Sequence, residues 1–201
     1  MSVASRRPSA VLPSARLVSF LLVVLSVLIL ALAACGGGGG GGGPTEPTPP
    51  SPPPPPTPGI VFTAQGTAGA NSLSLASGSA TTTTTLILEL RANQVTDLYG
   101  VAFDLAYPSA QLQFTRVTAG PLLSGGAVQA VVTTPGTLVV GGTHLGNVPG
   151  ATGSGVVLTL EFTAVAAGEG SFAFSRNSAL DSHGQAISGL SWVAGSVRVT
   201  R

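Results

Sequence analysis

Over residues 60–201, apolar side chains recur at every second position, which is the period of a strand with one buried face. No window repeats at the 3.6-residue period of an amphipathic helix. The clearest alternating runs are 86–90, 101–107, 156–164, 172–174 and 193–199. Turn signals rich in Pro and Gly separate these runs, as at 107–109, 135–136, 149–150, 167–170 and 183–184. The pattern predicts a single all-β domain, an antiparallel β-sandwich, at 60–201.

The same alternation predicts which side chains face the core. Leu86, Phe103 and Phe162 share the inward parity of their runs, and Tyr107 shares the parity of Phe103. Thr163, one residue after Phe162, is expected to face solvent.

Residues 1–34 have the parts of a bacterial signal peptide. Arginines precede an apolar run at 17–34, and Leu32-Ala33-Ala34-Cys35 resembles the lipobox at which lipoproteins are cleaved and lipidated. The resemblance implies removal of residues 1–34 and a lipid on Cys35, the only cysteine. The alternative is an uncleaved membrane anchor, because about 18 apolar residues can just span a bilayer. Both interpretations place the rest of the chain outside the cytoplasm, tied to the cell envelope; a lipoprotein would lie at the outer membrane or cell surface.

Residues 35–59 predict a disordered tether that starts at the lipidated cysteine. Eight glycines at 36–43 behave as a flexible coil, and the proline-rich stretch at 44–59 favours polyproline II, a semi-rigid spacer.

Charge excludes one class of partner. After residue 34 the chain has five arginines, seven acidic residues and no lysine, a formal net charge of five minus seven, or −2. Nucleic-acid binding needs clustered cations, so we expect no nucleic-acid partner.

The order of segments in 60–201 resembles the cohesin family. The segments that carry the resemblance are Phe103-Asp104-Leu105-Ala106-Tyr107, the strand 155–162 followed by Gly168 and Phe172, the turn 181–185, and the closing strand 195–199. The resemblance implies a cohesin-like jelly-roll topology and a non-catalytic function. Cohesins hold dockerin modules of polysaccharide-degrading enzymes by one flat sheet face, and related sandwiches bind polysaccharide directly. A structural envelope lipoprotein without a ligand is the third possibility.

The candidate binding residues are Asp104, Thr159, Glu161 and Trp192. The first three occupy outward positions on two strands; if those strands share a face, they would offer polar contacts to a protein partner. In the family, polar side chains on the strand ending at the tyrosine contact the dockerin, and here only Asp104 among the matching positions is polar. Trp192 has two interpretations: an exposed ring that stacks on sugar or anchors a protein, or a ring covered by a loop.

No motif predicts catalysis. The sequence lacks a Gly-x-Ser-x-Gly elbow, a His-Glu-x-x-His helix and zinc-spaced cysteines, so we expect no enzyme, no catalytic residue and no cofactor. The segment Asp181-Ser182-His183-Gly184 could offer oxygens to calcium, but with a single carboxylate it favours a plain turn and no metal.

Overall fold

The computed structural model describes residues 57–201, which form eleven strands and one short 3-10 helix. The predicted signal peptide, Cys35 and the predicted tether up to residue 56 lie outside the described residues. In chain order the elements are β1 (Gly59–Ala64), β2 (Ser72–Ser77), β3 (Thr85–Leu98), β4 (Gly100–Ala106), β5 (Leu112–Ala119), η1 (Pro121–Leu123), β6 (Ala127–Thr134), β7 (Thr137–Thr143), β8 (Ala151–Ala164), β9 (Gly168–Leu180), β10 (Ser191–Val193) and β11 (Gly195–Thr200).

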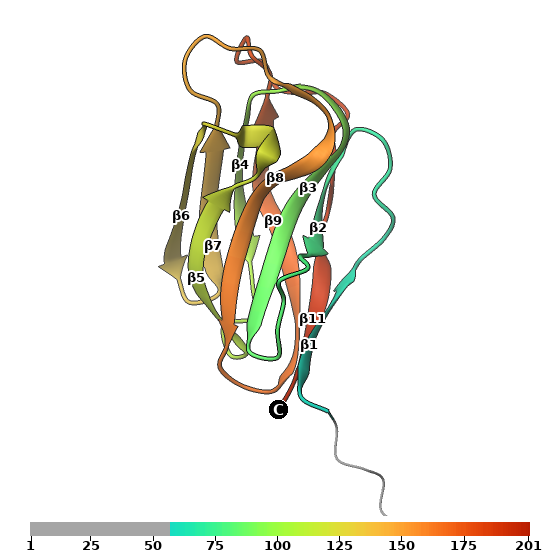
Figure 1. The fold of residues 1–201 in the computed structure, drawn as a ribbon, viewed down its shortest axis with the longest axis vertical. Helices are drawn as coiled ribbons and strands as arrows, with labels where there is room; N and C mark the ends of the chain where they lie inside the picture. The colour runs from blue at the N-terminus through green and yellow to red at the C-terminus, as the bar shows by residue number, and fades with distance from the viewer. Residues whose placement is uncertain (1–56) are drawn as a thin grey trace, which may run out of the picture. The chain divides into compact units, whose positions relative to one another are not determined.

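The strands form two sheets packed face to face, which confirms the predicted all-β sandwich (Figure 1). One sheet has the order β1-β11-β9-β4-β7-β6, and the other β10-β2-β3-β8-β5. Neighbouring strands are antiparallel except for β10, which runs parallel to β2. In Figure 1, β8 and β3 lie in front of β4 and β9.

The core between the sheets is built from the residues that the alternation placed inward. Leu86, Leu88 and Leu90 on β3 are fully buried and pair across the sheet with Phe162, Leu160 and Leu158 on β8. Phe103, Leu105 and Tyr107 are buried in the opposite sheet. The predicted parity is therefore confirmed for these strands.

Val157 is an exception to the alternation. It is fully buried although its neighbour Leu158 is buried as well. The register between β3 and β8 shifts between Leu90 and Arg91, so a β-bulge inserts one extra residue and interrupts the period of two.

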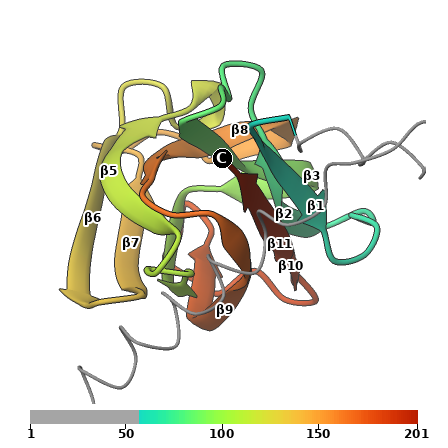
Figure 2. The same ribbon diagram turned by 90° about the horizontal axis from the view of Figure 1, so that it is seen from below.

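The start of β1 and the end of the chain lie side by side. Gly59 pairs with Thr200 in the antiparallel β1–β11 ladder, and the Thr200 hydroxyl donates to the Thr57 carbonyl (2.9 Å). Figures 1 and 2 show the C-terminus beside this strand pair. Residues 57–59 therefore lie at the same end of the sandwich as Thr200. Within residues 57–201 no helix is long and apolar enough to cross a membrane.

Candidate binding face

The outward surface of β4, β7, β6 and residues 173–180 of β9 forms an open four-stranded face, here called the β4 face. Small side chains occupy its middle: Ala102 on β4 is exposed and pairs with Gly141 on β7. Ser178 on β9 and Gln129 on β6 continue this row to either side. A partner could therefore approach the backbone of these central strands closely.

The β4 face is hollowed where these small residues meet. A groove of about 410 Å³ has Gly100, Ala102 and Gly141 in its floor, with Leu180 and Gln129 on its two sides. No charged side chain lines it. The sequence analysis did not identify this groove, although two consecutive glycines inside a strand, which weaken it, are a signal of a close approach.

The β4 face has fewer charges than the surfaces around it, since the exposed pair Arg198–Glu169 (3.1 Å) on β11 and β9 of the same sheet lies outside it. The four segments of the β4 face contain only Asp104 and Arg176 as charged residues. The outer surface of β2, β3, β8 and β5, here called the β3 face, instead carries two exposed ion pairs, Arg91–Glu89 (2.6 Å) and Arg116–Glu161 (2.8 Å). Charges that stay hydrated mark a solvated surface, so the β4 face is the better candidate for contact with another molecule.

Asp104 faces outward, as predicted, but it is not free to contact a partner. Only 7% of the residue is exposed, because Arg176 lies over it: the guanidinium Nε (2.7 Å) and Nη2 both donate to Asp104 Oδ2. A register shift between β4 and β9 at this point, and a left-handed backbone at Arg176 (φ 47°), accompany the contact. The pair leaves the β4 face without net charge.

The structure does not bring the predicted polar residues together. Asp104 lies on β4, whereas Thr159 and Glu161 lie on β8 in the other sheet. The expectation that these strands share a face is wrong, because the parity of a strand fixes inside and outside but not the sheet to which it belongs. Thr159 and Glu161 point to solvent on the β3 face.

The interpretation of Trp192 as an exposed ring is also wrong. Its ring packs against Phe103 and Phe174, with centroid distances of 5.6 and 5.0 Å, and the residue is half-buried against the core. β10 adds to the edge of the second sheet, where the indole closes one end of the core. Within the part of the chain that the structure describes, every Phe, Tyr and Trp side chain is buried or half-buried.

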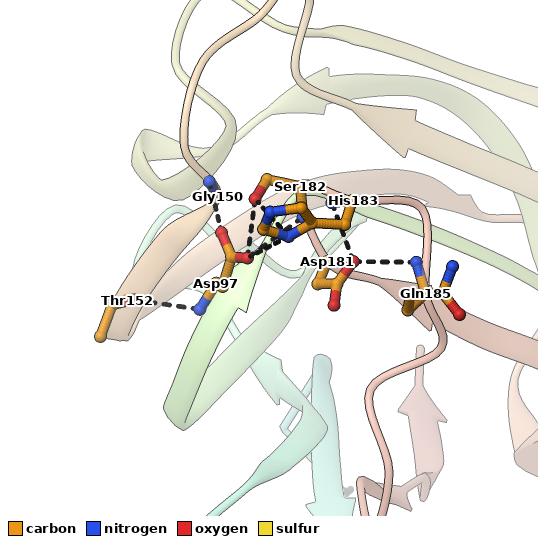
Figure 3. A network of polar contacts seen from close by, with 7 residues as sticks. All are labelled: Asp97, Gly150, Thr152, Asp181, Ser182, His183 and Gln185. Carbon is orange, nitrogen blue, oxygen red and sulfur yellow. Dashed lines mark hydrogen bonds and ion pairs between the residues drawn. The ribbon is translucent and has the colours of Figure 1, made fainter.

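A polar cluster joins two loops to the end of β3 (Figure 3). Asp97, at the end of β3, accepts hydrogen bonds from the Gly150 amide (2.7 Å) on Oδ1 and from the Ser182 hydroxyl (2.7 Å) on Oδ2. Asp181 Oδ1 accepts from the His183 and Gln185 amides (2.9 and 2.8 Å), which confirms a turn at this position. Asp97 thus holds the β7–β8 and β9–β10 loops against β3, whereas Asp181 closes a turn within the β9–β10 loop.

The fold brings a second carboxylate to Asp181, which the sequence did not show. Asp97 arrives from a distant part of the chain, and ligand atoms of Asp97, Asp181 and His183 lie within 4.8 Å of one another. The backbone amides and the Ser182 hydroxyl already engage oxygens of both carboxylates, so the cluster is explained as a loop staple.

The hydrogen bonds to Asp97 predict how the stability of the domain depends on pH. The Ser182 hydroxyl, the Gly150 and Ser182 amides and the nearby His183 lower the pKa of Asp97 below its usual 3.8, against an opposing effect of burial. A lowered folded-state pKa contributes stability above pH 3.8 that is lost as pH falls through the lower value. We expect wild type to lose more unfolding free energy than Asp97→Asn between about pH 5 and pH 2, measured by urea melts. Ser182→Ala should reduce that difference; parallel pH curves for all three proteins would contradict the assignment.

Comparison with known proteins identifies the family. The family model described as the cohesin domain matches residues 61–199. The chain belongs to the cohesin family. Cohesin domains are non-catalytic modules that bind other proteins, so protein binding is the function class that membership supports.

Solved cohesin structures have a fold similar to that of this chain. Cohesin A11 (type II) from Bacteroides cellulosolvens has a TM-score of 0.55 at 15% identity, covering 65% of this chain and 99% of that one. The second type II cohesin of an adaptor scaffoldin from Acetivibrio cellulolyticus has 0.55 at 17%, covering 65% and 91%. A type II cohesin–X-dockerin complex from Acetivibrio cellulolyticus matches with 0.52 at 18%, covering 60% and 93%. No curated protein matches the chain.

Proposed function

We propose that this cohesin domain holds a dockerin-bearing protein outside the cytoplasm, through its β4 face. The observation that carries the proposal is the groove above Gly141, set in a surface whose only two charges neutralise each other. A face of this kind can be desolvated by a partner without stranding a charge, whereas burying the β3 face would desolvate two ion pairs.

The family supports the class of partner. A similar solved structure is a cohesin in complex with an X-dockerin protein, and the resemblance of this sequence to cohesins implies a dockerin on a polysaccharide-degrading enzyme. Direct polysaccharide binding has less support, because Trp192, the ring expected to stack on sugar, is half-buried and packs against the core.

Titration calorimetry tests the proposal. The chain without its lipid anchor, residues 36–201, is titrated with dockerin modules encoded by the same organism and, in parallel, with soluble polysaccharides. We expect at least one dockerin to bind with a Kd of about 1 µM or tighter. Binding of a polysaccharide alone, or of none of the ligands, would contradict a dockerin-holding function.

We also propose that the domain is displayed from a lipid on Cys35, which ties its partner to the cell envelope. The proposal is supported by the sequence of the signal peptide and of the residues that flank the cysteine. We expect Cys35→Ser to abolish labelling by radioactive palmitate in the producing cell, whereas Gly37→Ala, in the tether, should keep it. Equal labelling of the Cys35→Ser chain would rule out the lipid anchor.

A further inference from the structure

We propose that the partner of the β4 face inserts one aliphatic side chain into the groove above Gly141, and that the contact around it is uncharged. The inference rests on the proposed function, because it specifies the chemistry of the dockerin surface that this chain can hold. It assigns to Gly141 the role of keeping the groove empty.

The groove exists because small residues lie between residues with longer side chains. Its floor is formed by Gly100, Ala102 and Gly141 on the two central strands, whereas Leu180 on β9 and Gln129 on β6 have longer side chains. Its volume of about 410 Å³ is near the lower end of ligand pockets, which favours one or two inserted side chains over an extended molecule.

The chemistry of the lining selects an apolar occupant. Most of the lining is aliphatic or glycine, and the polar groups are the neutral Ser178, Thr143 and Gln129. A charged side chain inserted here would lose its hydration without meeting an opposite charge, since Asp104 is already paired with Arg176. An aliphatic side chain has no charge whose hydration is lost when it enters the groove. The polar lining groups remain able to bond to polar atoms of the partner around it, as in an interface hot spot.

Gly141 allows a direct test, because its position is open. A Cβ built there would meet no atom within 4 Å, so larger side chains would extend into the groove without disturbing the fold. Gly69, in the β1–β2 loop, is equally open and accepts bonds from Ser72 and Asn93 on the other sheet, away from the β4 face. It is the matched control.

The experiment titrates the tightest-binding dockerin module into the wild-type chain and the Gly141→Ala, Gly141→Leu and Gly69→Leu variants. We expect Gly141→Leu to weaken binding by about 100-fold, Gly141→Ala by less, and Gly69→Leu not at all. Urea midpoints of the Gly141 variants should not fall below that of wild type. Raising the salt concentration from about 50 to 500 mM should change Kd by less than about threefold, because no net charge is paired.

A double-mutant cycle identifies the inserted side chain. Exposed aliphatic residues of the dockerin are replaced by alanine one at a time; one replacement should weaken binding to wild type strongly but add little to the loss in Gly141→Leu. Unchanged dockerin binding by Gly141→Leu would overturn this inference and the assignment of the β4 face, and would leave only the dockerin-holding function standing. A steep salt dependence would overturn the uncharged contact alone. Self-association of the free chain that Gly141→Leu abolishes would assign the groove to a second copy and overturn it as well. If no dockerin binds wild type, the proposed function itself fails.

Discussion

Phe162→Ala is expected to lower the free energy of unfolding by about 3–5 kcal/mol, the largest effect we predict in this chain. The ring is fully buried near the end of β8 and contacts three other aromatic rings, those of Tyr107, Phe114 and Phe172, at centroid distances of 5.3, 5.6 and 5.7 Å. The strands around it are held in two hydrogen-bonded sheets, so the cavity left by the ring cannot collapse fully. Urea melts followed by circular dichroism measure the loss.

Thr163→Ala is the matched control on the next residue of the same strand. Thr163 is exposed and its only side-chain bond is to the exposed Thr115 hydroxyl (3.2 Å), so its removal should cost well under ~1 kcal/mol. Equal losses for the two variants would mean that the packing around Phe162 contributes far less than its burial implies.

Asp104→Lys is expected to destabilise the domain by about 2–3 kcal/mol. The change places an ammonium group at a position that is 7% exposed and directly beneath the Arg176 guanidinium. The sequence placed Asp104 at an outward position open to a partner; in the structure Arg176 covers the carboxylate, so charge reversal here disturbs the fold itself. Part of the effect is screened, since the Arg176 side chain itself is largely in solvent.

Glu161→Lys gives the comparison on the opposite sheet. Its partner Arg116 is exposed, and an exposed ion pair contributes little, so the loss should stay below ~1 kcal/mol. Because Glu161 lies on the β3 face, this reversal should also leave partner binding unchanged. Two reversals of equal cost in urea melts would contradict the difference in burial between the two carboxylates.

Much of the fold could be predicted from the sequence because strand parity is a local property. Successive side chains of a strand point to opposite faces, so the apolar members at Leu86, Phe103 and Phe162 had to face a common core. The order of the apolar and turn segments was likewise enough to show the resemblance to cohesins. The position of Val157 could not be predicted, because a bulge depends on how two strands pair and not on either strand alone.

Only the tertiary structure decided how the outward residues combine into a site. Parity placed Asp104 and Glu161 outside, but the assignment of β4 and β8 to different sheets put them on opposite surfaces. Arg176 covers Asp104 from 72 residues away, and Asp97 reaches Ser182 from 85 residues away. Such contacts depend on which strands are neighbours, and that is settled by burial of the whole core at once. The sequence by itself determined that this chain forms a sandwich and which side chains fill its core. The pairing of the strands decided which outer surface has no net charge and contains a groove.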